Sequence, residues 1–237
     1  MMGPEVRNQK RAAYDFIMKQ SKEMGLDNVL AYPGYLRSET ILNSGQSFSF
    51  DLMANATKDG QAIGGTENRL LQNDAFYIER IGLFLYTATV TSNGAGNPLT
   101  NAVRAVQRMH QFPNLQVFAA NTPAVIALYN GRLTIKQNDR IYCRDHDLYS
   151  MQYVDTAQQG QTVFTASTVD ASAFDNERSF VEAAEPMFRL NGQSNVEATI
   201  DLPAPTVFTG VTDATIYGVL YLKGWRAQNG GIARTVR

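Results

Sequence analysis

The stretch from 75 to 90, AFYIERIGLFLYTATV, restricts the fold most, because it is the strongest strand signal in the chain and is apolar on both faces. Its apolar residues alternate in one phase before Gly82 and in the other phase after it, and a bulge or bend at that glycine would explain the change. Neighbours such as Phe76 and Tyr77 point to opposite faces of a strand. Such a strand is normally covered on both sides, so we expect a helix, a loop or another subunit against its outer face.

The rest of the sequence also indicates strands, roughly eight or nine in all, separated by loops of uneven length. Pro203 and Pro205 are expected to end one of them, and Tyr32-Pro33-Gly34-Tyr35 is expected to form a turn. There is no internal repeat and no alternation of strands with helices. The predicted fold is therefore mainly β: a jelly-roll or Greek-key β-sandwich with an N-terminal helix and short inserted helices. The strands are expected within 38–52, 75–90, 132–136, 141–143, 148–154, 162–165, 188–190, 195–202 and 215–225.

The first segment is expected to be a helix that begins near Pro4 and stops at Gly25, since proline suits the first turn and glycine the position after the last. Its apolar residues fall near one face, which favours an arm or a peripheral helix. Two short helices are expected in the middle of the chain, one after Asn97-Pro98 and one from Thr122-Pro123 to Asn130-Gly131.

Charged residues make up 18% of the chain, below the roughly 25% typical of soluble domains. A polar surface with little charge costs less to desolvate, so it suits burial between subunits, although an ordinary secreted β-protein can have the same composition. Cys143 is the single cysteine, which excludes an intrachain disulfide. Neither a signal peptide nor an apolar run long enough to cross a membrane is found, so we expect synthesis and folding in a cytoplasm.

Both ends of the chain are mildly basic, although the formal net charge is only −1. That balance argues against a global electrostatic footprint for nucleic acid. The ends are expected to contact neighbouring subunits or, weakly and in a salt-sensitive way, packaged nucleic acid. Charged ends that only promote solubility are the alternative. The candidate residues are Arg7, Lys10, Arg11, Lys19, Lys22, Arg226, Arg234 and Arg237.

No enzymatic constellation stands out, so we expect no catalytic activity, no metal and no cofactor. His110 falls on the apolar stripe of an expected helix, which favours packing. Arg144-Asp145-His146-Asp147 would need a loop to gather its side chains on one metal, and a solvated charged turn is favoured instead. Phosphate-binding loops, the dinucleotide fingerprint and the nucleophile elbow are absent from the sequence.

A likeness to a known family is carried by the segments SETILNSGQSFSFDL, NDAFYIERIGLFLYTA, ALYNGRLTIKQNDRIYC, FRLNGQSNVEATIDLP and ATIYGVLYLKGWRAQNGG. Their order and texture resemble the jelly-roll coat proteins of tailless icosahedral bacterial viruses. The resemblance spans most of residues 38–231. It implies a virion component with extended termini that contact neighbours. Because a double jelly roll usually needs a longer chain, a single jelly roll with inserted helices is expected.

The expected function is that of a self-assembling capsid subunit, located in the virion after synthesis in the cytoplasm of a host; major shell, vertex and decoration roles remain open. Its partners would be copies of itself and other virion proteins. The alternative is a carbohydrate-binding or receptor-binding jelly-roll module that uses exposed aromatic residues. The expected divisions are an N-terminal helical arm at 1–34, the jelly-roll β-sandwich at 35–226 and a basic C-terminal tail at 227–237. The aromatic candidates for sugar binding are Tyr32, Tyr35, Tyr149 and Tyr153.

Overall fold

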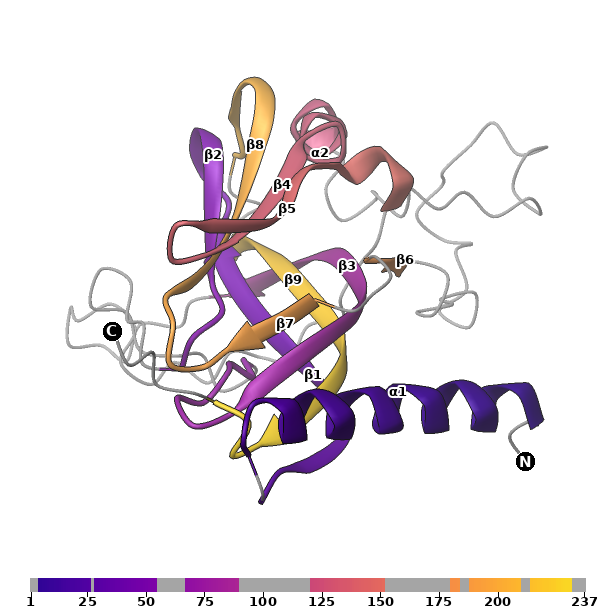
Figure 1. Cartoon of the computed structure of the whole chain (residues 1–237). Helices are drawn as coiled ribbons and strands as arrows, with labels where there is room; N and C mark the ends of the chain where they lie inside the picture. The colour runs from indigo at the N-terminus through magenta and orange to yellow at the C-terminus, as the bar shows by residue number, and fades with distance from the viewer. Residues whose placement is uncertain are drawn as a thin grey trace.

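Two antiparallel β-sheets form most of the computed structural model (Figure 1), which describes residues 4–26, 28–54, 67–89, 120–151, 180–183, 188–209 and 214–231. Its helices are α1 (Pro4–Glu23), α2 (Thr122–Tyr129) and the 3₁₀ helix η2 (Leu148–Met151). Its strands are β1 (Leu30–Ile41), β2 (Ser44–Asp51), β3 (Ala75–Thr89), β4 (Arg132–Gln137), β5 (Arg140–Asp147), β6 (Val181–Glu182), β7 (Phe188–Asn191), β8 (Val196–Val207) and β9 (Ala214–Gln228).

The strand pairing follows a nested pattern. Sheet A has the order β1-β9-β3-β6, with β7 also paired to β3, and sheet B has the order β2-β8-β4-β5. The first described strand thus pairs with the last, β2 pairs with β8, β3 with β7 and β4 with β5, all antiparallel. The turn of the innermost pair lies at Asn138, whose positive φ of 52° suits a tight turn. The expectation of a mainly β, two-sheet fold is confirmed.

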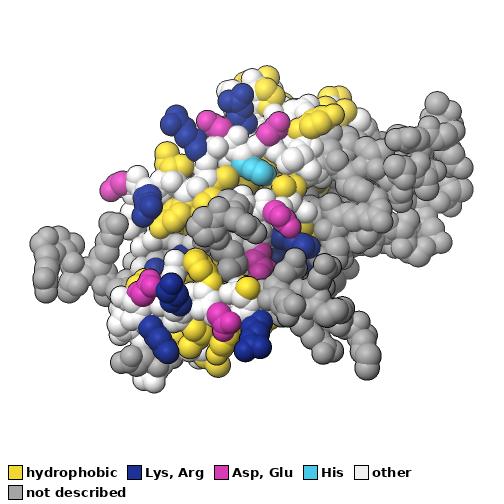
Figure 2. Space-filling model, turned by 45° about the vertical axis from the view of Figure 1, so that its right-hand side comes forward, with side chains coloured by type: hydrophobic (Ala, Val, Ile, Leu, Met, Phe, Trp, Pro, Cys, Tyr) yellow, Lys and Arg dark blue, Asp and Glu magenta, His cyan; other side chains and the backbone are white. Residues whose placement is uncertain are grey.

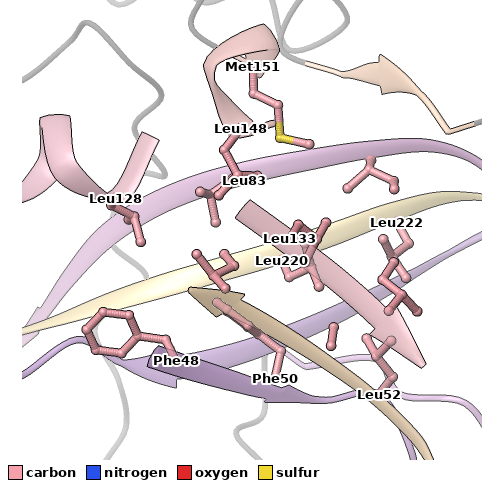
Figure 3. Close-up of a cluster of buried hydrophobic side chains, with 14 of the residues drawn as sticks. Phe48, Phe50, Leu52, Leu83, Leu128, Leu133, Leu148, Met151, Leu220 and Leu222 are labelled. Carbon is pink, nitrogen blue, oxygen red and sulfur yellow. The ribbon is translucent and has the colours of Figure 1, made fainter. Parts of the chain in front are cut away.

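The main core lies between the two sheets, where one set of alternate side chains from each strand points inward (Figure 3). Phe48 and Phe50 of β2 face Leu220 and Leu222 of β9 across this space. Helix α2 and helix η2 close one part of the core with Leu128, Leu148 and Met151.

Strand β3 changes phase, as expected, but the bulge lies at Glu79 and the prediction of a bulge at Gly82 was wrong. The register with β9 shifts between Ile78 and Arg80, which leaves Glu79 as the extra residue. The bulge forms where β3 meets Gly224, which has no side chain to keep the two backbones apart. Gly82 instead leaves room for aromatic rings, since a Cβ there would lie 2.8 Å from Phe180 and Phe84.

Tyr32-Pro33-Gly34-Tyr35 does not form a turn but belongs to β1, which begins at Leu30. Strand β1 is an edge strand of sheet A, and an edge is where a strand tolerates proline. At the other end of the chain, β9 continues to Gln228. The two strands pair along their whole length, so the sheet extends past both expected boundaries of the sandwich.

Strand β8 also continues through its two prolines to Val207, so they do not end it. Asp201 pairs with Ser47 and Thr206 pairs with Gly45, which leaves residues 202–205 of β8 opposite a single residue of β2. The prolines lie in this wide irregularity, where the ladder needs no N–H from them.

Other elements agree in part with those expected from the sequence. Helix α1 begins at Pro4 and is followed by Gly25 with a φ of 73°, and α2 matches the expected second short helix. The expected strand at 148–154 begins instead with η2. The expected helix after Asn97, the expected strand at 162–165 and His110 lie outside the described residues.

A short segment at 67–70 joins the two sheets along one side of the sandwich. Asn68 exchanges two backbone hydrogen bonds with Arg37 of β1, at 2.7 and 3.0 Å. Two residues on, the Leu70 N–H donates to the carbonyl of Leu52, just after β2, and the Leu70 carbonyl accepts from Ala54. This segment therefore satisfies backbone groups of both edges, which would otherwise be open to pairing.

Candidate assembly surfaces

Helix α1 packs on the outer face of sheet A through a small apolar cluster that is separate from the main core. Ile17 is fully buried in this cluster, and Phe16 meets Tyr77 edge to face with ring centroids 6.5 Å apart. The ring centroids of Tyr14 and Trp225 are 6.4 Å apart. The indole N–H of Trp225 donates to a carboxylate oxygen of Glu79 at 2.8 Å. The bulge of β3 thus presents the carboxylate that fixes the tryptophan under the helix.

Tyr77 lies beneath this contact and is 1% exposed. Burial raises the pKa of its phenol, and the nearby guanidinium of Arg189 opposes that change. Ser21 of α1 donates its hydroxyl hydrogen to the carbonyl of Ile17, so the buried face of the helix carries no unpaired hydroxyl at this position. Among the described side chains of α1, those in this cluster or packed on it are Ala13, Phe16, Ile17 and Met18.

The N-terminal half of α1 extends past the edges of both sheets (Figure 1). Four of the basic residues expected to make subunit or genome contacts, Lys10, Arg11, Lys19 and Lys22, are exposed on this helix. Arg7 lies in the same helix, although its side chain is not among those described. The structure therefore places Lys10 and Arg11 on the projecting half of α1, and Lys19 and Lys22 on the exposed side of its docked half.

Arg226 is not part of that basic surface. Its side chain is 12% exposed, and one guanidinium nitrogen lies 3.9 Å from a carboxylate oxygen of Asp74. It also donates to the side-chain oxygen of Asn68 and to the backbone carbonyl of Arg69. These bonds tie β9 to the segment that joins the two sheets. Arg234 and Arg237 lie outside the described residues.

The same outer face of sheet A carries an aromatic patch beyond the helix, formed by Tyr35, Phe84, Tyr86, Phe180, Tyr217 and Tyr221. Tyr86 and Tyr217 stack with ring centroids 5.0 Å apart, and Tyr86 donates to Glu39 at 2.5 Å. Tyr35 stacks on Tyr221 at the same separation, with the ring planes inclined by 17°. Tyr35 is 42% exposed, so this rim of the patch faces outward.

A second candidate surface lies on sheet B, and this one carries no charged residue. The ends of β2 and β8 rise together as a two-stranded ribbon at one end of the sandwich (Figure 1). Neither of the sequences that build it, 42–50 and 202–209, contains a charged residue. Pro203, Ala204, Pro205 and Val207 are exposed on it. The sequence pattern that marks this ribbon is the absence of charged residues from both of its segments.

The charged run at 144–147 forms part of β5, so the expectation of a turn was wrong, although Arg144, Asp145 and Asp147 are exposed as expected. Asp145 has a φ of 52°, which marks an irregular point in this edge strand. Burial lowers the pKa of His146, while Asp147 opposes that shift, and burial raises the pKa of the Cys143 thiol. Figure 2 shows the described histidine on a face where acidic and basic side chains are scattered among hydrophobic and uncharged ones. No group of three metal-ligating side chains occurs among the described residues.

The aromatic residues proposed for sugar binding are dispersed. Tyr32 and Tyr35 lie on β1 and Tyr149 on η2, and all three are exposed. Tyr153 is outside the described part of the chain. The sequence identified the exposed tyrosines but not the stacking of Tyr35 on Tyr221, which depends on the pairing of β1 with β9.

Comparisons of this chain with known protein families, with curated proteins and with solved structures find no match. Among the described helices, none is long and apolar enough to cross a membrane.

Proposed function

We propose that this protein is a structural subunit that assembles with copies of itself, that its sandwich is a jelly roll, and that the assembly is a viral capsid. The nested pairing supports the jelly roll, because that fold arises when an antiparallel ribbon of four strand pairs wraps into two sheets. The strand pairs of this chain are β1–β9, β2–β8, β3–β7 and β4–β5. The connections from β1 to β2, β2 to β3 and β3 to β4 all pass from one sheet to the other, as such wrapping requires.

The observation that carries the assembly is the outer face of sheet A. A sandwich needs one apolar face per sheet, but this sheet has two, because Tyr77, Phe84, Tyr86, Tyr217 and Val219 lie opposite the core side. Part of this second face is covered by α1, and its rim at Tyr35 is exposed. Tyr77, Phe84, Tyr86 and Tyr217 are buried within the chain itself, and the exposed rim at Tyr35 is the part of this face that we assign to subunit contacts.

The exposed cations of α1 support the expected contacts with neighbouring subunits or with packaged nucleic acid. The projecting half of the helix can reach beyond its own sandwich, and Lys10 and Arg11 lie on it. Under this proposal the other partners are further virion proteins, and the site of action is the virion.

The test is the mass of the purified protein in solution, measured by light scattering over a concentration series and followed by electron microscopy. Discrete, symmetric oligomers or particles are expected. A mass that stays at 26.2 kDa over the whole series would reject self-assembly.

A sugar-binding module is the second candidate, and the exposed ring of Tyr35 is the observation that favours it. An aromatic ring on a sheet face can stack against a sugar. A glycan array with the monomeric protein tests this function. Saturable binding that is lost in Tyr35→Ser, without any large assembly of the wild-type chain, would favour the module over the coat subunit.

A further inference from the structure

We propose that α1 is a releasable lid on the outer face of sheet A, and that it opens while both sheets stay folded. A single chain is enough for this motion, so the lid does not depend on the proposed function. The docked helix is held through apolar and aromatic side chains. Docking leaves the buried hydroxyl of Tyr77 without a hydrogen-bond partner among the described residues, and this unpaired group favours release.

The seat of the lid is the set of buried side chains beneath the helix, which come from three neighbouring strands. Ala31 of β1, Ala227 of β9 and Ala75 of β3 are paired in one row, and their small side chains leave room for a helix above the sheet. Trp225 of β9 and Tyr77 of β3 are paired in the next row on the same face. The seat is therefore a row of alanines beside two large aromatic rings.

The seat is held in shape by the sheet and not by the helix. Strand β9 pairs with β1 on one side and with β3 on the other, so the backbone beneath α1 is paired in both directions. The indole N–H of Trp225 donates to Glu79 in the bulge of β3, so the largest side chain of the seat is fixed from within the sheet. The helix can therefore leave by local opening, without unfolding the strands below it.

The polar groups at the docked end of α1 form their hydrogen bonds within the helix. The N–H of Gly25 donates to the carbonyl of Lys22 at 2.9 Å, and the N–H of Leu26 donates to the carbonyl of Ser21 at 3.0 Å. These are the two bonds of a Schellman turn. The hydroxyl of Ser21 donates to the carbonyl of Ile17 at 2.8 Å. None of these bonds is lost on release, so docking is stabilised by the burial of Ile17 and its apolar neighbours.

Tyr77 opposes this apolar contact. Its side chain is 1% exposed, and its hydroxyl makes no hydrogen bond to a described residue. Two polar side chains lie beside it, but Ser21 is bonded within α1 and the guanidinium of Arg189 donates to the carbonyl of Gly230. A hydroxyl that has lost its water without gaining a partner raises the free energy of the docked state. Release returns water to this hydroxyl, so Tyr77 favours the open lid.

A second fully buried tyrosine supplies the matched control. Tyr129 of α2 lies in the main core, and its hydroxyl donates to the carbonyl of Leu83 at 2.7 Å. Replacement by phenylalanine keeps the ring at either position. Tyr129→Phe removes a hydrogen bond from the core, whereas Tyr77→Phe removes a hydroxyl that has no partner there. The first substitution is therefore expected to destabilise the domain, and the second to hold the lid closed.

Hydrogen exchange of the full chain, followed by mass spectrometry, measures the opening of the lid. In the wild type the amides of α1 are expected to exchange faster than those of β3 and β9, because they exchange through local opening. Tyr77→Phe is expected to slow the exchange of the α1 amides by about fivefold or more. Tyr129→Phe is expected to lower the urea midpoint of the domain and to leave the exchange of the α1 amides unchanged.

Trp225 provides a second measurement on the wild type, because it is the only tryptophan and lies in the seat. Acrylamide is expected to quench its emission more strongly at urea concentrations that leave the amides of β3 and β9 protected. Equal or faster exchange of α1 in Tyr77→Phe would show that the hydroxyl is bonded in the closed state, to water for example, and would overturn the proposal. Loss of helix and strand protection at the same urea concentration would also overturn it, since α1 would then open only when the sheets unfold.

Discussion

Gly224 of β9 and the carbonyl oxygen of Tyr77 approach so closely that a Cβ atom at position 224 would overlap that oxygen. The same Cβ would lie 3.1 Å from the backbone nitrogen of Glu79. The close approach is the geometric requirement of the bulge that places Glu79 beside Trp225.

The substitution Gly224→Ala is therefore expected to lower the free energy of unfolding by about 2–3 kcal/mol, because both strands must move apart. Urea unfolding at equilibrium measures it. Gly45→Ala is the matched control, since the nearest heavy atom to a Cβ there is 3.8 Å away, and its effect should stay within about 0.5 kcal/mol. Equal stabilities of the two variants would contradict the strict need for glycine in the bulge.

Ile17→Ala is expected to release α1 from sheet A, because this side chain is fully buried in the small cluster beneath the helix. The lost burial costs about 2–4 kcal/mol, which is large for a contact of this size. Trp225 is the only tryptophan, so its fluorescence reports the docking directly. A red-shifted emission that acrylamide quenches more readily is expected. Lys19→Ala, on the exposed side of the same helix, should leave the spectrum unchanged.

Removal of residues 1–12 separates the projecting half of α1 from its docked half. Ile17 and Phe16 remain, so the emission of Trp225 should not change. If the projecting half joins neighbouring subunits, light scattering should show a folded chain that no longer forms large particles. Normal particles from this shortened chain would contradict a role for the projecting half in assembly.

His146 is expected to make stability depend on pH. Burial lowers its folded pKa below the ordinary value of 6.5, so the unfolded chain binds the proton more readily. Stability is unaffected by this group above the unfolded pKa and falls as the pH drops below it towards the folded pKa. Urea unfolding between pH 8 and pH 5 should show a steeper loss for the wild type than for His146→Gln. Parallel curves for the two proteins would refute this assignment.

The sequence predicted the parts of the fold that depend on local patterns. The double apolar face of β3, the limits of α1 at Pro4 and Gly25, and the start of α2 at Thr122 all follow from spacing and from end signals. The change of phase in β3 was also visible, but its position depends on Gly224, which comes from another strand. The sequence of β3 alone therefore does not show where its bulge lies.

The predictions based on the prolines and on the charged run were wrong because the effect of these residues on a strand depends on how that strand pairs with its neighbours. Pro33 is accepted by β1 because β1 is an edge strand, and Pro203 is accepted because it faces an irregular stretch of β2. The charged run at 144–147 stays in a strand because Arg132 and Leu133 of β4 pair with it. Among the candidate site residues, Arg226 resembled a tail cation, but Asp74 and Asn68 hold it at the end of the sandwich.

The nested pairing has a consequence for biosynthesis. Leu30 pairs with Gln228, and β9 lies between β1 and β3, so the middle of sheet A is filled by the last described strand to leave the ribosome. Until that strand arrives, β1 and β3 have no partner between them and their apolar faces are exposed. Contacts so distant along the chain are reached slowly, which leaves the nascent chain open to premature association. The folding of β9 would then be the step that decides between an ordered product and an aggregate.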